Sequence, residues 1–562
     1  MELIECFLQF TVQKALEEAE VLFHKSSPPE KPFEFKYSSR DILLNLSKDP
    51  FFSSEPLNED LKALSAYINY LLGVNFLETE ETSQGEEYFK NALSGFSQLS
   101  EEKMSAFLNI LQDIYNNLGF LLINREELEK GMGCLAKAED LYLSLKDVEE
   151  FNCQDLKSYL QNRLKNNKTR FNPYWKMGIS QAKTESFFTL TLFYLAQAYT
   201  KLGMKEKAAF YCGNTMKRQY ENKEFQLKEW CINSISLAEF YQNNKNFAQA
   251  FYLLQAGDSL IPAGKRKKLK ATFNMSFARL FQEFLKYMVT IISEEQKDFE
   301  GISNIVNKKH LIFETFPTKF VDLEVPKDPE GVTKIFRLSN TQYKKSLAFF
   351  VLDGYVTEHI EMSQEVSEML KTLALLETDN PRKFALLEKR KDLLEPLQNQ
   401  LNPKAYPAFC QKLLVELAEI YNEMFENRFH ELFLKNDAKP KKNKVDAMNK
   451  YGFAAIGEYQ KIEKMLLEQQ KEQKDQPKEH YQSIINTRFN MAKAFNKIYA
   501  ADKKEKVEMM KKSLDNYKFI VEFIKEALKT KGNLEWDFSE QLKICTEMVE
   551  LIPAKIDKIN NE

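Results

Sequence analysis

The sequence predicts an all-α protein, an irregular right-handed solenoid of helical hairpins in two subdomains joined by a long linking helix. Three observations support this prediction. The 562 residues include only 17 Gly and 17 Pro, so turn-forming residues rarely interrupt the chain. Strand-like alternation bounded by Asn-Gly or Asp-Gly turns is almost absent. Small and apolar residues recur at fixed offsets in the first half, which is typical of stacked helical repeats.

Four copies of this pattern each begin with a Leu followed by a small residue. The first copy is Leu72-Gly73, Phe76, Gly85, Phe89 and Ala92, and the others are Leu118-Gly119, Leu122, Gly131, Leu135 and Ala138; Leu195-Ala196, Tyr199, Ala208, Cys212 and Thr215; and Leu237-Ala238, Tyr241, Ala250, Leu254 and Gly257. The small residues let two helices approach closely, while the larger ones fill the groove between them. This is the arrangement of tetratricopeptide repeats.

The repeats are irregularly spaced. Their starts at 72, 118, 195 and 237 lie 46, 77 and 42 residues apart, against about 34 in the ideal repeat. We therefore expect long helices and an insertion around 145–185. In the second half, Leu417-Ala418 and Met491-Ala492 begin the pattern but have no small partner at the expected offset, so these repeats are degenerate.

Apolar residues at three- to four-residue steps predict one long helix in the middle of the chain, from Phe273 to Met288 and beyond. The stretch FPTKFVDLEVPKDPEGVTKIF follows it and cannot be continuous helix because of its three prolines. We place a hinge there. The expected domains are an N-terminal solenoid over 1–262, the linking helix over 263–298 and a C-terminal helical subdomain over 299–562.

The composition argues against several functional classes. The formal net charge is −3, from 79 basic and 82 acidic residues, so no global field attracts nucleic acid or anionic lipid. No run of about 18 uncharged apolar residues predicts a membrane span, and the start MELIECFLQF lacks the basic residues of a secretory signal. The seven cysteines form no CxxC pair. We expect a cytosolic protein with reduced thiols.

No motif predicts catalysis, a cofactor or a metal. The five histidines show no ligand spacing. GMGCLA fits a dinucleotide-binding pattern, but no strand precedes it. The basic run GKRKKLK at 264–270 has two interpretations, a phosphate-binding or nuclear-localisation patch and a solvated helix start.

The first helix of each hairpin is expected to line the concave face of the solenoid. Helical spacing directs Tyr194 and Gln197 inward in the third repeat, and Ser236 and Glu239 in the fourth. The alternative for Tyr194 is simple packing between helices. A groove that is both polar and aromatic suits a protein helix or loop better than a small metabolite.

The words YLAQAY, EKAAFYC, MKRQ and EWCIN in the first half resemble the KIF-binding protein family. So do DGYVTEHIE, LALLETDNPRK, LLEPLQNQLNP, SLDNYKFIVEF and EMVELIP in the second half. The resemblance runs in one order over nearly the whole chain. It implies a tetratricopeptide-like protein, not an enzyme, that binds the motor domains of a subset of kinesins and blocks their attachment to microtubules.

The resemblance also implies partner-binding residues, which are Tyr194, Gln197, Gln219 and Ser236, the last replacing a threonine of the family pattern. It further implies a cytoplasmic, cytoskeleton-associated protein without cofactor, and we expect a monomer. One departure is IPAGKRKKLK, which stands where the family carries a long acidic loop, so the choice of kinesins is expected to differ. The alternative function is a general scaffold that joins partners without inhibiting motors.

Overall fold

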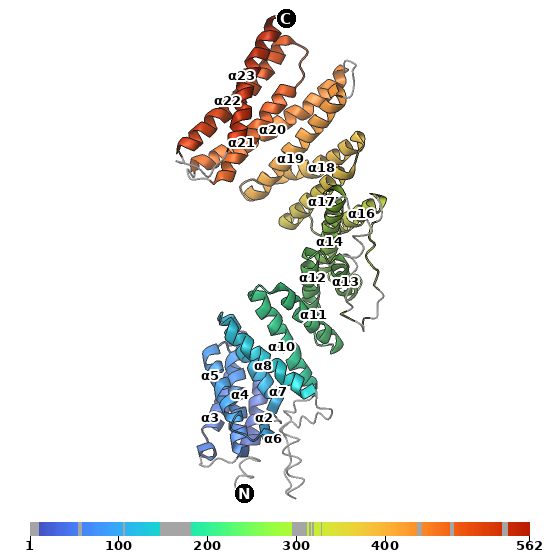
Figure 1. Cartoon of the computed structure of the whole chain (residues 1–562). Coiled ribbons are helices and arrows are strands. Elements are labelled where there is room, and N and C mark those ends of the chain that lie inside the picture. The colour runs from blue at the N-terminus through green and yellow to red at the C-terminus, as the bar shows by residue number, and fades with distance from the viewer. Residues whose placement is uncertain are drawn as a thin grey trace. The chain divides into compact units, whose positions relative to one another are not determined.

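The structure is a computed structural model. It describes residues 11–53, 59–104, 107–146, 181–294, 312–313, 316, 320–326, 329–434, 441–472, 477–530 and 538–561. All regular secondary structure in these ranges is helical (Figure 1). The insertion expected around 145–185 lies mostly outside the described residues. None of the described helices combines the length and apolar character that a bilayer crossing requires.

The chain forms two compact units. Unit 1 comprises residues Met1–Asn244, Gln255–Leu260 and Lys309–Val321, and unit 2 comprises Lys245–Leu254, Ile261–Lys308 and Asp322–Glu562. The helices of unit 1 are α2 (Gln13–His24), α3 (Glu34–Ser47), η2 (Pro50–Ser53), α4 (Glu59–Glu78), α5 (Thr82–Phe96), α6 (Glu101–Met104), α7 (Leu108–Asn124), α8 (Leu128–Lys146), α10 (Gln181–Lys201), α11 (Lys205–Glu221) and α12 (Leu227–Asn243).

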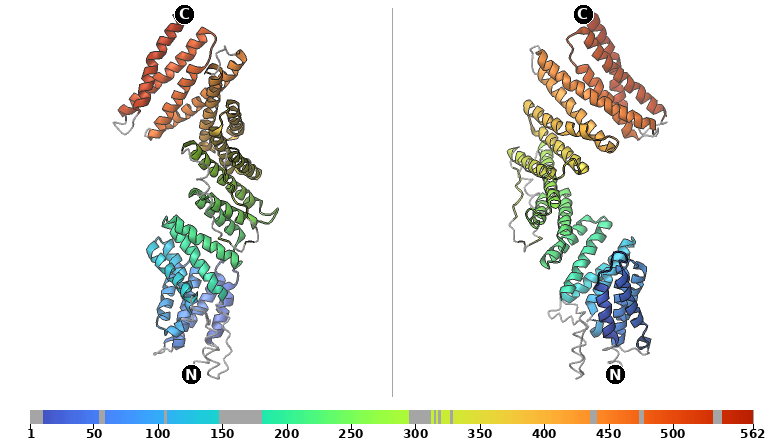
Figure 2. Two further views of the ribbon diagram at one scale, coloured as in Figure 1. Left: turned by 45° about the vertical axis from the view of Figure 1, so that its right-hand side comes forward. Right: turned by 180° about the vertical axis from the view of Figure 1, so that it is seen from behind.

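The helices of unit 2 are α14 (Lys267–Glu294), α16 (Pro329–Leu347), α17 (Val356–Leu376), α18 (Asn380–Gln400), α19 (Pro407–Phe429), the short π-helix η4 (His430–Leu434), α20 (Lys442–Glu472), α21 (Lys478–Lys497), α22 (Lys503–Thr530) and α23 (Ser539–Asn561). Helix α13 (Phe247–Ser259) is shared, because the division between the units falls at Leu254. Within each unit, helices that follow one another in the chain pack together (Figure 2).

The first two repeats form the hairpins that the sequence predicts. In the α4–α5 hairpin, a Cβ placed on Gly73 would lie 2.7 Å from Cδ1 of Phe89, and one on Gly85 would lie 3.1 Å from the carbonyl oxygen of Gly73. In the α7–α8 hairpin, Gly119 and Gly131 take the equivalent places. Glycine is therefore needed for close approach of the helices, and not for an unusual backbone conformation.

The third repeat is the α10–α11 hairpin, in which the rings of Tyr199 and Tyr211 stack with centroids 5.4 Å apart. In the fourth repeat, the thiol of Cys231 on α12 lies 3.5 Å from the carbonyl oxygen of Gly257. All-helical architecture in paired helices is thus confirmed, while the right-handed winding and the domain boundaries at 262/263 and 298/299 stay predictions.

A non-helical segment after α14 completes the core of unit 1. Trp230 of α12 is almost fully buried, and its centroid lies 5.2 Å from that of Phe313. Phe316 stacks on Tyr220 of α11 at 4.2 Å. The side-chain amide of Gln255 donates to the carbonyl oxygen of Val321 and accepts from its N–H, both at 2.9 Å. The described residues of this segment that belong to unit 1, namely 312–313, 316 and 320–321, are here called the strap.

The apolar stripe predicted in the middle of the chain forms α14, a 28-residue helix within unit 2. Its Phe273, Leu280 and Phe284 are fully buried. Two hydrogen bonds fix α14 against α16, since Ser339 Oγ donates to the carbonyl oxygen of Ala278 (2.8 Å) and Ser346 Oγ to that of Ala271 (3.0 Å). The described residues between 312 and 326 are non-helical, as their prolines predict, and Pro329 begins α16.

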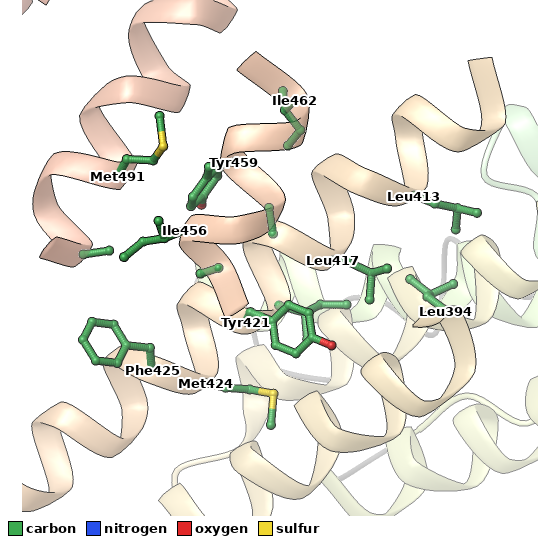
Figure 3. Close-up of a cluster of buried hydrophobic side chains, with 14 of the residues drawn as sticks. Leu394, Leu413, Leu417, Tyr421, Met424, Phe425, Ile456, Tyr459, Ile462 and Met491 are labelled. Carbon is green, nitrogen blue, oxygen red and sulfur yellow. The ribbon is translucent and has the colours of Figure 1, made fainter. Parts of the chain in front are cut away.

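The degenerate second half keeps the helix pairing by other means. Figure 3 shows its main core, where Leu417 and Tyr421 of α19 meet residues of the neighbouring helices. The close contact between α19 and α20 is at Gly452, where a Cβ would lie 2.7 Å from Ile498 and 3.0 Å from Phe425. Between α21 and α22, Ser513 Oγ donates to the carbonyl oxygen of Ala492 at 2.8 Å.

Candidate partner-binding surface

The four predicted partner-binding residues lie on three consecutive helices of unit 1. Tyr194 and Gln197 are one turn apart on α10, Gln219 is in the last turn of α11, and Ser236 is on α12. Gln197 and Ser236 are exposed, and Gln219 is half-buried. We call this set the candidate surface.

Tyr194 both packs and remains partly accessible. Its ring stacks on Phe120 of α7, with centroids 4.9 Å apart and planes inclined by 29°. It also contacts the small core formed by Ile123, Leu135 and Leu195. The stacking fixes the ring, so that a partner meeting its accessible part orders little additional side-chain freedom.

A cavity of about 170 Å³ opens elsewhere in unit 1. It is lined by Leu16, Ala19, Glu20, Phe23 and His24 of α2, Ser39 and Leu43 of α3, Tyr67, Tyr70, Leu71 and Val74 of α4, and Phe187 of α10. Phe187, Thr191 and Tyr194 follow one another at i, i+4 and i+7 on one stripe of α10. The same stripe thus contributes to the cavity and to the candidate surface.

Sequence reasoning missed this cavity. The signal available was the apolar stripe Leu16, Ala19 and Phe23, which precedes the first recognised repeat and belongs to α2. The small residues that mark the paired helices of the repeats do not accompany this stripe. The cavity is also lined by Phe187, which lies more than 160 positions further along the chain. No local motif could bring those parts together.

A strip of buried polar side chains on α7 connects α4 with α10. The Tyr70 hydroxyl donates to Asp113 Oδ2 at 2.7 Å. The Thr191 hydroxyl donates to Asn116 Oδ1 at 2.8 Å, and Asn116 Nδ2 donates to the carbonyl oxygen of Phe187 at 2.9 Å. These bonds hold the α10 stripe in register against α7.

Two carboxylates lie near the Tyr194 hydroxyl, the buried Asp113 and Glu78, and Glu78 is paired with Lys36 at 2.7 Å. Burial, then Asp113 and Glu78, raise the pKa of Tyr194 to about 12, so its hydroxyl remains a donor at neutral pH. Burial and Glu20 likewise raise the pKa of Tyr67. Among the described residues, no cluster of His, Cys, Asp and Glu could hold a metal ion.

Asp113 gives a pH-dependent prediction. Burial raises its pKa from 3.8 to about 6, against the opposing effect of the hydrogen bonds from Tyr70 and Asn117. Between these two values the folded state binds more protons than the unfolded state, so the free energy of unfolding falls as the pH rises. Asp113→Asn keeps an acceptor for Tyr70 and removes the titration. We expect the variant to be more stable at about pH 7 by up to roughly 3 kcal/mol.

Urea unfolding of both proteins at several pH values measures this difference. It should shrink as the pH falls through about 6, and it should approach zero only below about pH 3, where Asp113 is protonated in both the folded and the unfolded state. A difference that is constant over this range would show that the effect of Asp113→Asn is not one of ionisation.

In the comparison with known proteins, the matching family model and the most similar relatives carry the same family name. The family model described as KIF-1 binding protein C terminal matches residues 293–559. KIF-binding protein of Mus musculus is 28% identical over 629 residues, covering 97% of each chain. That of Homo sapiens is 28% identical over 639 residues, covering 98% of this chain and 97% of its own.

A more distant relative keeps nearly the same coverage, and a solved structure covers about half of this chain. KIF-binding protein of Drosophila melanogaster is 22% identical over 587 residues, covering 95% of this chain and 94% of its own. A cryo-EM structure of the KIFBP core is 24% identical and covers 54% of this chain and 99% of its own, with a TM-score of 0.34. At this TM-score the superposition adds nothing to the sequence matches.

Proposed function

This chain belongs to the KIF-binding protein family, whose members are binding proteins and not enzymes, and on that premise we propose that it binds the motor domains of a subset of kinesins and blocks their attachment to microtubules. The observation that carries this proposal is the match to curated KIF-binding proteins over 97% of both chains. A protein with this role acts in the cytoplasm, at the microtubule cytoskeleton, and needs no cofactor.

The candidate surface is the proposed contact with the motor. Tyr194 would supply contact area and a hydroxyl donor, while Gln197 and Gln219 would hydrogen-bond to the motor and Ser236 would add a smaller polar contact. Inhibition is competitive, because a motor surface that is held here is not available to the microtubule.

Joint replacement of Tyr194 and Gln197 by Ala tests the surface. We expect a loss of about 2 kcal/mol, which is roughly a 30-fold rise in the Kd for a bound motor domain. Tyr194→Phe separates the two roles of the tyrosine, because it retains the stacking on Phe120 and lacks the hydroxyl. Fluorescence anisotropy with labelled motor domains measures the affinity, and circular dichroism confirms that the variants are folded.

Phe210→Ala is a matched control. Phe210 is 63% exposed on α11 and lies nine residues before Gln219, which is half a turn around that helix. The Phe210→Ala substitution should therefore leave the affinity for the motor domain unchanged. Equal affinity of the Tyr194/Gln197 double variant and the wild type would refute the proposed surface.

Co-sedimentation of motors with microtubules, with and without the protein, separates inhibition from scaffolding. Inhibited motors leave the pellet together with the protein. Motors that bind the protein and still enter the pellet, carrying it with them, would instead establish the general scaffold.

A further inference from the structure

Unit 2 carries a basic surface that is made from two segments far apart in the sequence. Lys265, Arg266, Lys267 and Lys268 lie at and just before the start of α14, and all four are exposed. The hydrogen bond from Ser346 to Ala271 brings the end of α16 to the start of α14, and the residues just before Ser346 are the exposed Lys344 and Lys345. We call these six residues the α14–α16 basic patch.

The charges of the patch are largely uncompensated. Within the described part of the chain, no carboxylate lies within ion-pair distance of these six side chains, and Lys268 Nζ lies 5.4 Å from the ring centroid of Tyr355. The loop that carries Tyr355 contributes one exposed acid, Asp353. The patch is therefore strongly positive although the whole chain has a net charge of −3.

The position of the lysines on α14 is electrostatically unfavourable for the helix. A helix N-terminus carries a partial positive charge, and cations there destabilise it. Helix α14 has no acidic residue in its first turn. Helix α22 offers the contrast, because it also begins with two lysines but has Glu505 in its first turn and Asp502 accepting from the Glu505 N–H at 3.1 Å. Apart from the contact of Lys268 with the ring of Tyr355, these cations have no favourable partner in the described part of the chain, which points to a role in binding.

We propose that the α14–α16 basic patch binds an acidic, extended polypeptide segment of a partner protein. Five of the six cations are lysines on flexible stems, spread over two helix ends and without a buried donor among them. Such an array suits several loosely placed carboxylates and does not suit bidentate recognition of a single phosphate. An extended chain presents side chains at about 3.3 Å per residue, so a Glu-rich segment can meet many of these cations at once.

Two other polyanions fit less well. Single-stranded nucleic acid is usually held on exposed aromatic rings, and the ring at this patch, Tyr355, is half-buried beside Lys268. An anionic bilayer presents a wide negative plane, which would also face the many surface carboxylates of this chain. A single extended peptide is narrow enough to contact the patch without also facing these carboxylates. This inference does not depend on the kinesin proposal, because the candidate surface lies in unit 1.

The test uses the full chain and a fluorescein-labelled oligoglutamate peptide. The patch variant replaces Lys265, Arg266, Lys267 and Lys268 by Gln, and the matched control replaces Lys503, Lys504, Lys506 and Lys511 of α22, which are equally exposed. We expect the wild type and the control to bind the peptide with similar Kd, and the patch variant to bind about ten-fold more weakly. Binding should also weaken as salt shortens the screening length.

Equal Kd values for the patch variant and the control would overturn the proposal. So would patch-dependent binding to phosphatidylserine vesicles or to single-stranded RNA without any binding of oligoglutamate. Removing cations from the first turn of α14 should not destabilise the helix, so circular dichroism of the patch variant is expected to match that of the wild type.

Discussion

Arg390→Met is expected to lower the free energy of unfolding of unit 2 by about 3 kcal/mol. Arg390 of α18 is 1% exposed, and its Nε donates to Ser367 Oγ at 3.1 Å. Its guanidinium lies 3.5 Å from Glu416 and 3.7 Å from Glu423 of α19. Methionine fills similar space but leaves two partly buried carboxylates without their cation.

Arg382→Met is the matched control on the same helix. The Arg382 side chain is 76% exposed, and its ion pairs with Glu377 and Asp379 are 3.8 and 3.9 Å long. Such surface pairs contribute at most about 1 kcal/mol. Hydrogen exchange of α18 and α19 measures the difference locally, which is preferable in a chain of two units whose unfolding need not be a single transition. If the two variants accelerated exchange equally, Arg390 would not be the anchor of this helix pair.

Gly131→Ala is expected to destabilise the α7–α8 hairpin by about 1 to 3 kcal/mol. The added Cβ would lie 2.7 Å from Ile123 Cγ1, and 3.1 Å from both the carbonyl oxygen of Gly119 and the backbone N of Ile123. A side chain can rotate away from such a contact, but the backbone atoms of α7 can move only if the helices separate. Faster hydrogen exchange in α7 and α8 would report this.

Gly133→Ala provides the control two residues further along α8. A Cβ there meets no atom within 4 Å, so the gain in helix propensity should stabilise the hairpin by up to about 1 kcal/mol. The two variants are thus predicted to differ in sign. Destabilisation of the same size by both would mean that helix propensity, and not close packing, determines the effect of Gly131.

The first two repeats could be predicted because glycine pairs mark their close contacts at a constant offset. Gly73 faces Gly85, and Gly119 faces Gly131, each twelve residues apart. In unit 2, three of the contacts between paired helices are serine hydroxyls bonded to alanine carbonyl oxygens, at separations of 61, 75 and 21 residues. A contact without a fixed offset leaves no period in the sequence, so the pairing of α14 with α16 was not predictable.

The candidate surface was likewise predictable from the sequence only in part. Helical periodicity predicts that Tyr194 and Gln197 lie on one side of the helix that contains them, and both residues belong to α10. The stacking of Tyr194 on Phe120, and the Asp113 carboxylate that raises its pKa, depend on how α7 and α10 pack. Such contacts join residues more than 70 positions apart and leave no local signature.

The strap has a consequence for the order in which the nascent chain can fold. Trp230 is enclosed by Phe313 and Phe316, which follow it by more than 80 residues. The ribosome must therefore synthesise all of α14, a helix of the other unit, before the last piece of unit 1 emerges. Until then the side chains of Trp230 and Tyr220 lack their contacts with Phe313 and Phe316, and they expose an aromatic surface that favours aggregation. Any protein shortened between Ser259 and Phe313 would keep that surface permanently.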